Sequence, residues 1–213
     1  MTKAVIFDMD GVLIDSERQS LIDNQQFLAS YGKQVSLGEM YFLIGSTDVK
    51  NYEYMALKLQ VSWEEVQGMY QQYLREHPWD ISRIFRSEVL EVFQYLQEKH
   101  IKIALASSSP PDFIQQVLKD CEIEKYFDYV VSGRIFKETK PNPEVYFHVC
   151  SKLEICANEG LVIEDSEYGI LAGKRAGMEV VAVKDELFPL DLSQADYIIE
   201  DLRDIVDIVK RRG

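Results

Sequence analysis

The chain has 213 residues, of which 46% are hydrophobic and 28% are charged, and its formal net charge at pH 7 is -13. A chain of this length can bury one substantial core and still carry a smaller inserted unit. The composition excludes a disordered chain and a membrane-spanning one. The negative charge argues against nucleic acid and anionic membranes as partners, because both need a basic surface.

The sequence also carries signals about the compartment. The first three residues lead straight into a short strand-like segment, with no long apolar stretch of a secretory signal and no apolar run near the ~18 residues of a membrane helix. Cys121, Cys150 and Cys156 are scattered and lack metal-ligand spacing, which predicts buried, reduced thiols. We therefore expect a cytoplasmic protein, and a chain of this size can act as a monomer.

The first predicted strand, Ala4 to Phe7, is followed at once by two acids, Asp8 and Asp10. Burying a carboxylate is costly unless a cation or hydrogen-bond donors pair with it. Two interpretations are open at this point: a cation lies beside the two acids, or they are ordinary turn residues.

Residues 15–81 offer amphipathic helical segments and no convincing strand. The stretches Ser36 to Glu39 and Ser62 to Glu65 both fit the capping-box pattern that begins a helix. Apolar and aromatic side chains recur at helical spacing between Tyr52 and Leu74, among them Leu57 and Trp63, and are predicted to be mostly the inner face of a small bundle. We predict a helical insertion after the first strand.

Residues 82–213 return to an alternation of strands and helices. Further strands are predicted at Ile101 to Ala106, Tyr129 to Val131, Leu161 to Ile163, Val180 to Val183 and Tyr197 to Ile199. Helices are predicted at Ser87 to Lys99, Asp112 to Lys119, Pro143 to Lys152, Ser166 to Ala176 and Asp201 to Arg212, with Asn142 as an N-cap and Gly177 as a stop. Strand, helix, strand in succession predicts a doubly wound α/β core with a parallel sheet, built from residues 1–14 and 82–213.

Polar residues follow several of the predicted strands directly. They are Asp8 and Asp10, the serines Ser107, Ser108 and Ser109, and the pair Glu164 and Asp165; Lys140 precedes a helix. In open parallel sheets ligands bind beyond the carboxyl ends of the strands, so these side chains are expected to meet there. Four converging carboxylates would repel one another, and a divalent metal would resolve this; oxygen ligands of this kind suit Mg²⁺.

A bound Mg²⁺ would let an acidic protein hold a phosphate. The charges of four carboxylates and a phosphate dianion still exceed those of Mg²⁺ and Lys140, so one carboxyl is expected to keep its proton. A protonated Asp10 would act as a general acid, and an ionised Asp8 as a nucleophile toward phosphorus. Taken singly, the acids could be turn residues, the serines and Glu164 with Asp165 helix-start residues, and Lys140 a surface lysine.

The segments "FDMDGVLIDSE", "IALASSS", "KPNPEVY" and "VIEDSEYGILAGKRAG" resemble, in order, the four motifs of the haloacid dehalogenase superfamily. They are most similar to its β-phosphoglucomutase-like branch of small-molecule phosphatases and phosphomutases. The resemblance implies a Rossmann-like core with residues 15–81 as a mobile cap. It also implies that Asp8 is the nucleophile and Asp10 the acid/base, that Ser107, Ser108 and Lys140 bind the phosphoryl group, and that Asp8, the Asp10 backbone carbonyl, Glu164 and Asp165 hold Mg²⁺.

One departure from the mutases of this branch bears on the reaction. In "IGSTDVK", Asp48 occupies the apparent position of the arginine with which such mutases grip a second phosphate, although Arg18, Lys50 or Lys58 could compensate. We therefore expect hydrolysis of a small phosphorylated metabolite, with a phosphomutase as the alternative. A non-catalytic phosphate-binding module is the third hypothesis, and the intact Asp8 and Asp10 pair speaks against it.

Overall fold

The computed structural model describes residues 1–44, 46, 48–185 and 190–213. The chain divides into two compact units, one formed by Met1–Asp15 with Ile81–Gly213 and the other by Ser16–Asp80. The first unit contains the sheet, and the second is helical. Each unit therefore has its own interior.

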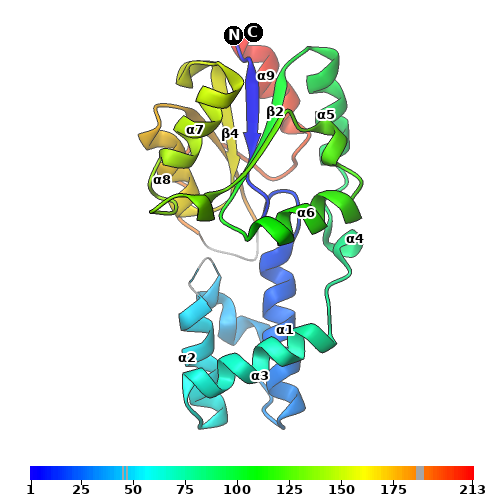
Figure 1. Ribbon diagram of the computed structural model, residues 1–213, viewed down its shortest axis with the longest axis vertical. Coiled ribbons are helices and arrows are strands. Elements are labelled where there is room, and N and C mark those ends of the chain that lie inside the picture. Colours follow the sequence, from blue (N-terminus) through cyan, green and yellow to red (C-terminus); the bar gives the residue numbers. More distant parts are fainter. Residues whose placement is uncertain (45, 47, 186–189) are drawn as a thin grey trace. The chain divides into compact units, whose positions relative to one another are not determined.

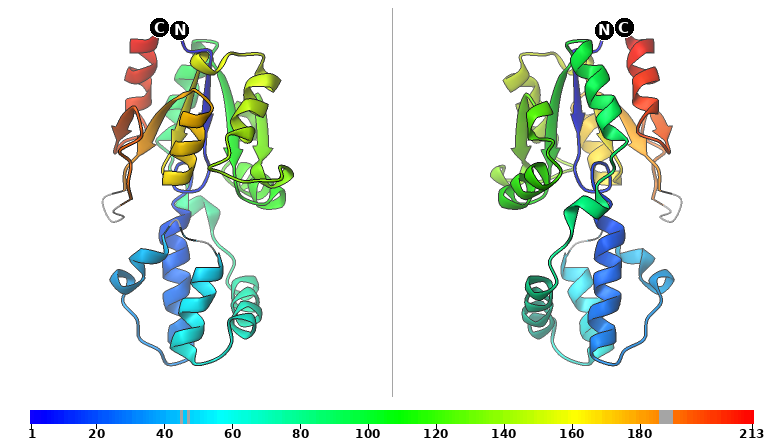
Figure 2. Two further views of the ribbon diagram at one scale, coloured as in Figure 1. Left: turned by 90° about the vertical axis from the view of Figure 1, so that its left-hand side faces the viewer. Right: turned by 90° about the vertical axis from the view of Figure 1, so that its right-hand side faces the viewer.

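Six strands in the described part of the first unit form one parallel sheet in the order β3-β2-β1-β4-β5-β6. The strands are β1 (Ala4–Phe7), β2 (Lys102–Ser107), β3 (Tyr129–Ser132), β4 (Gly160–Glu164), β5 (Glu179–Val183) and β6 (Tyr197–Ile199). β1 is central, with β2 on one side and β4 on the other, so the strand order reverses there and a crevice is expected beyond the carboxyl ends. Figure 2 shows the strands running in one direction, with their carboxyl ends at one edge.

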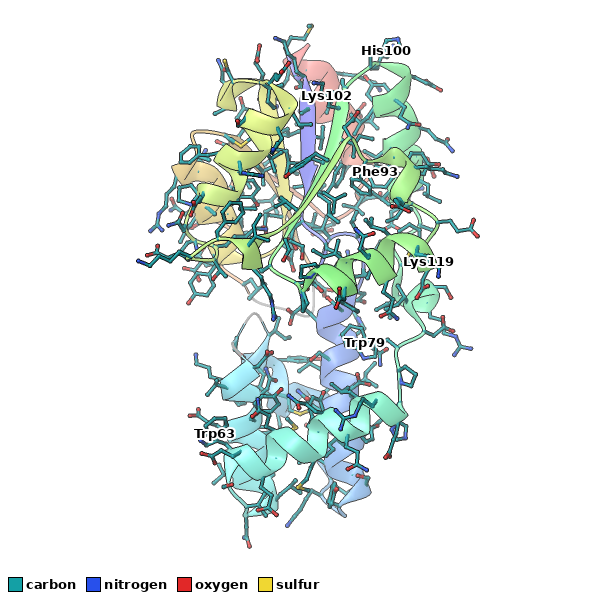
Figure 3. The ribbon with its side chains drawn as sticks, viewed as in Figure 1. Trp63, Trp79, Phe93, His100, Lys102 and Lys119 are labelled. Carbon is teal, nitrogen blue, oxygen red and sulfur yellow. The ribbon has the colours of Figure 1, made fainter. Side chains whose placement is uncertain are left out.

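Helices cover both faces of this sheet, which confirms the predicted doubly wound fold. The helices of this unit are α4 (Ile81–Ile84), α5 (Val89–Glu98), α6 (Pro111–Asp120), α7 (Glu144–Leu153), α8 (Glu167–Arg175) and α9 (Asp204–Arg212), and its 3-10 turns are η2 (Glu124–Tyr126), η3 (Gly133–Ile135) and η4 (Ala157–Glu159). Figure 1 shows α7 and α8 on the opposite side of the sheet from α5. On the α5 side Phe93, labelled in Figure 3, packs edge-on against Phe7 with ring centroids 5.2 Å apart. Every residue of β1 and β4 is therefore buried, which explains the continuous apolar sequence of these central strands.

Two helix boundaries test the predicted start and stop residues. Gly177 follows α8 with a positive φ of 74°, the left-handed conformation in which glycine ends helices, so the predicted stop is confirmed. The predicted N-cap at Asn142 is wrong by one residue, because α7 begins at Glu144 with Pro143 as its cap. The Asn142 side chain nevertheless accepts a hydrogen bond from the Glu144 amide at 2.9 Å. Pro143, which lies between them, has no N–H, so the Glu144 amide is the first one available to Asn142.

The second unit, in the described residues, consists of α1 (Ser16–Ser30), the 3-10 segment η1 (Leu37–Leu43), α2 (Asp48–Leu59) and α3 (Trp63–Glu76). Phe27 of α1 packs edge-on against Tyr70 of α3, with centroids 5.1 Å apart, and the Trp79 indole, labelled in Figure 3, donates to the Asp23 carboxylate. The predicted inner face is wrong at Leu57 and Trp63, which are 76% and 40% exposed.

The position of Leu57 on its helix explains its exposure. Leu57 lies two residues after the buried Met55 on α2, about 200° further round the helix. A strictly local count of apolar residues misses this rotation.

The three cysteines are free thiols, but only Cys150 is buried, while Cys121 is half-buried and Cys156 exposed. The predicted burial is therefore wrong for two of them. None of the helices in the described part of the chain combines the length and hydropathy that a membrane-spanning helix needs.

Candidate active site

The loop after β1 brings the first two acids to the carboxyl edge of the sheet. The Asp8 amide still donates to the Ile163 carbonyl of β4 at 2.9 Å, so Asp8 leaves the sheet in register. Gly11 then turns the chain with a positive φ of 73°, and a Cβ at this position would lie 1.8 Å from Asp165 Oδ2. Glycine is needed here both for the backbone conformation and for the close approach of the Asp165 carboxylate.

Lys140 binds two of the carboxylates at once. Its Nζ donates to Asp8 Oδ1 and to Glu164 Oε1, each at 2.6 Å, and to the Ala106 carbonyl at 2.8 Å. All three ammonium donors therefore have an acceptor. The Lys140, Asp8 and Glu164 side chains are only 6%, 10% and 1% exposed, so the interpretation of Lys140 as a surface lysine is wrong.

Glu164, the last residue of β4, is surrounded by donors. Oε1 accepts from Lys140 and from the Tyr146 hydroxyl at 3.1 Å. Oε2 accepts from the Asp165 and Ser166 amides at 3.2 and 3.3 Å and from the Ser166 hydroxyl at 3.0 Å. Ser166 Oγ in turn caps α8 by accepting from the Gly169 amide at 3.0 Å. The start of α8 and the Glu164 carboxylate are thus fixed together.

Three acids form a group that could hold a metal ion. One carboxylate oxygen from each of Asp8, Glu164 and Asp165 lies within 4.8 Å of the others. When all three are ionised, Lys140 compensates only one of the three charges. The remaining negative charge and the all-oxygen donor set suit a hard divalent cation.

The fourth acid, Asp10, is not part of this group of three, but it lies at the same edge of the sheet, where its charge helps to raise the pKa of Asp8. Asp10 Oδ2 accepts from the Ser109 hydroxyl at 2.6 Å and from the Ser107 hydroxyl at 3.4 Å. The Ser109 amide donates to Ser107 Oγ at 3.0 Å, and its carbonyl accepts from the Ser132 hydroxyl at 2.6 Å. Hydroxyl donors after β2 therefore hold Asp10 without need of a cation.

Ser108 differs from its two neighbours. It is exposed, and its backbone carbonyl accepts a hydrogen bond from Arg134 Nε at 3.2 Å. Ser107 is fully buried at the end of β2, and Ser109 touches Asp10. The side chains of Ser107 and Ser109 thus lie at the acids, whereas that of Ser108 has no such contact among the described residues.

Burial governs the electrostatics of the site. It raises the pKa of the Asp8 carboxyl, while the charge of Lys140 acts in the opposite direction. Burial alone would lower the pKa of Lys140, but the charges of Asp8 and Glu164 raise it well above its ordinary value. Burial, and then the charge of Glu164, raise the pKa of Tyr146, whose hydroxyl therefore keeps its proton and donates. Lys140 is thus a fixed cation, and a further cation would favour the ionised form of Asp8.

The prediction omitted Tyr146 from this array, and it placed Ser109 at the sheet edge without giving it a role. Ser109 stands in the serine run that the prediction did use, and its contact with Asp10 depends on the path of the loop after β2. Tyr146 lies six residues after Lys140 on α7, where an aromatic side chain indicates only core packing. The sequence carries no local signal that this hydroxyl reaches Glu164.

Similarity to known proteins extends over most of the chain. A sequence profile of the family described as haloacid dehalogenase-like hydrolase matches residues 5–183. The matched range includes every residue of the candidate site.

Individual relatives are phosphate-processing enzymes by name. The chain is 32% identical over 187 residues to a phosphorylated carbohydrates phosphatase of Thermotoga maritima, covering 83% of this chain and 82% of the relative. It is 32% identical over 216 residues to a candidate pyrophosphatase, PpaX, of Caldanaerobacter subterraneus, covering 97% and 94%. A crystal structure of a candidate β-phosphoglucomutase from Thermotoga maritima superposes with a TM-score of 0.83 at 29% identity, covering 99% of both chains.

Proposed function

The chain belongs to the haloacid dehalogenase-like hydrolase family, and on this premise we propose that it is a Mg²⁺-dependent phosphatase of a small phosphorylated metabolite, such as a sugar phosphate. The observation that carries the proposal is the buried array in which Lys140 bridges Asp8 and Glu164, with Asp10 two residues beyond Asp8. Binding alone would not need a second carboxyl at that spacing, which argues against a non-catalytic phosphate-binding module.

Asp8 is the proposed nucleophile. Its Oδ1 is fixed by Lys140, and its other oxygen would attack phosphorus to form an aspartyl phosphate. The buried Lys140 ammonium is already in place, so it would stabilise the negative charge first on the Asp8 carboxylate and then on the phosphoryl oxygens. The Ser107 hydroxyl, fully buried at the end of β2, would donate to the same phosphoryl group.

Asp10 is the proposed acid/base. It would protonate the leaving alkoxide and then accept a proton from the water that hydrolyses the aspartyl phosphate. Its carboxyl is held by Ser109 at 2.6 Å. A rotation about its side chain would exchange this contact for the substrate oxygen.

The residues present fit a divalent metal. Asp8 and Asp165 would hold it, together with the Asp10 backbone carbonyl that the family motif implies. Glu164 lies close to the same metal position, but its oxygens already accept five hydrogen bonds. It would therefore orient the neighbouring ligands and Lys140 and would not bind the metal directly. When bound, Mg²⁺ would neutralise the phosphate and orient it toward Asp8.

Phosphomutase activity remains the alternative, because one structural relative is a candidate β-phosphoglucomutase. The proposed cap, residues 16–80, offers it limited support. Asp48 is exposed at the start of α2, and Lys58 is already paired with Glu39 at 3.7 Å. Gly45 and Thr47 of the "IGSTDVK" stretch lie outside the described residues. The phosphorylated carbohydrates phosphatase among the relatives favours hydrolysis.

The proposal extends to the setting of the enzyme. We place it in the cytoplasm as a monomer that acts on a small phosphorylated metabolite and has neither nucleic acid nor a membrane as a partner. The three free thiols support a reducing compartment.

The test is a phosphate-release screen over sugar phosphates, nucleotides and an aryl phosphate with Mg²⁺, using wild type and Asp8→Asn. The variant is nearly isosteric and should lose all turnover. Asp207→Asn is the matched control, because Asp207 is exposed on α9 and pairs with Lys210. With labelled substrate, acid-quenched wild type should carry phosphate that hydroxylamine removes. More than a few per cent of wild-type kcat in clean Asp8→Asn would rule out the nucleophile.

A further inference from the structure

Tyr146 combines a core position with a polar contact. It lies on α7, is fully buried, and packs in the apolar cluster between α7, α8 and the sheet. Its hydroxyl donates to Glu164 Oε1 at 3.1 Å. A phenylalanine would satisfy the packing equally well, so the hydroxyl needs a separate explanation.

The same side chain also contacts Lys140. The Lys140 ammonium lies 5.2 Å from the centroid of the Tyr146 ring, within the range of a cation–π interaction. Tyr146 therefore touches both partners of one buried ion pair, the lysine through its ring and the carboxylate through its hydroxyl.

The two oxygens of Glu164 depend on different elements. Oε2 is held by donors from its own chain neighbours, Asp165 and Ser166. Oε1 is held by Lys140 and Tyr146. Without the Tyr146 hydroxyl, Oε1 would depend on Lys140 alone, and Lys140 is the group whose partner changes during phosphoryl transfer.

We propose that Tyr146 is a positioning residue that fixes Glu164 and Lys140, and through Lys140 the orientation of Asp8. The inference rests on the proposed function for its role in turnover. When Asp8 becomes an acyl phosphate it loses its charge, so Glu164 is the carboxylate that remains to hold Lys140. The Tyr146 hydroxyl keeps Glu164 in place at that stage, and the ring keeps the ammonium directed toward the phosphoryl group.

The first test is Tyr146→Phe, which keeps the ring and removes one donor. We expect kcat to fall roughly 10-fold, the scale of a hydrogen bond to a charged group, with KM changed less than about 2-fold. The matched control is Tyr129→Phe. The Tyr129 hydroxyl lies 2.7 Å from Nε2 of His148, a residue of α7, and this contact is away from the acids. Both variants should lose similar stability in urea unfolding, while Tyr129→Phe keeps wild-type kcat. Equal kcat for the two variants would overturn the proposal.

The second test needs no turnover. In substrate-free and metal-free protein, the buried Lys140 ammonium should give a slowly exchanging ¹⁵Nζ–H signal by NMR. Tyr146→Phe should shift this signal or speed its exchange at least several-fold, and Tyr129→Phe should leave it unchanged. An unchanged Lys140 signal in Tyr146→Phe would refute the positioning role even if kcat fell. A changed signal in a chain that releases no phosphate would instead refute the proposed function.

Discussion

Gly169 offers a sharp test of how closely the acids are packed. A Cβ at this position of α8 would lie 1.8 Å from Glu164 Oε1, 1.9 Å from Cδ and 2.1 Å from Oε2. Real Cβ contacts are essentially never under 3.0 Å, so in Gly169→Ala the Glu164 carboxylate and the start of α8 must separate by at least about 1.2 Å. The displaced group is the one that holds Lys140 beside Asp8.

The expected consequence follows from that distance. A misplacement of about 1 Å in a positioned group costs about 10²-fold in rate, so Gly169→Ala should lower kcat by about two orders of magnitude. Alanine in a helix gains at most about 1 kcal/mol over glycine. Each hydrogen bond to a charged group contributes about 1.5 to 3 kcal/mol, so disturbing those of Glu164 should leave the variant destabilised by a few kcal/mol.

The assay is phosphate release with Mg²⁺, run beside urea unfolding. The control is Gly68→Ala on α3, where an added Cβ meets nothing within 4 Å. It should gain about 0.5 to 1 kcal/mol and keep full activity. A folded Gly169→Ala variant with kcat within about 3-fold of wild type would show that Glu164 need not occupy its place, and the reasoning would fail.

Three further outcomes are expected. The rate of Asp10→Asn should fall roughly 10²- to 10⁴-fold on sugar phosphates and much less on an aryl phosphate, whose leaving group needs no proton. Equal losses on the two substrates would show that Asp10 is not the general acid. EDTA should abolish phosphate release and Mg²⁺ should restore it, whereas Ca²⁺ should support it poorly. Asp165→Ala should sharply raise the Mg²⁺ concentration needed for half-maximal activity. Full activity in the presence of the chelator would contradict the metal site. A dehydrogenase-coupled assay should detect negligible glucose 6-phosphate from β-glucose 1-phosphate with bisphosphate primer, because Asp48 offers no cation for a second phosphate. Isomerisation faster than phosphate release would favour the mutase. Arg18 and Lys50 would then be the residues to test as the phosphate-binding cation.

The fold class, and the edge of the sheet at which the site lies, could be predicted from the residues alone. Apolar, β-branched runs alternating with helical segments specify a parallel sheet, because both faces of each strand must be buried. The carboxyl ends of such strands meet at one edge, so Asp8, Ser107 and Glu164 could be grouped without a structure. Gly177 could be identified as a helix stop because that signal is local.

The contacts between individual atoms depend on how the elements pack and could not be predicted in this way. Lys140 and Asp8 are 132 positions apart, and their 2.6 Å contact depends on the packing of α7 against the sheet. The Ser109 and Ser107 hydroxyls donate to the Asp10 carboxyl, and residue spacing could not show these contacts. The hydroxyl of Tyr146 is bound to Glu164 for the same reason. Hydrogen-bond partners are set by side-chain geometry across elements, whereas periodicity records only which face of an element is buried.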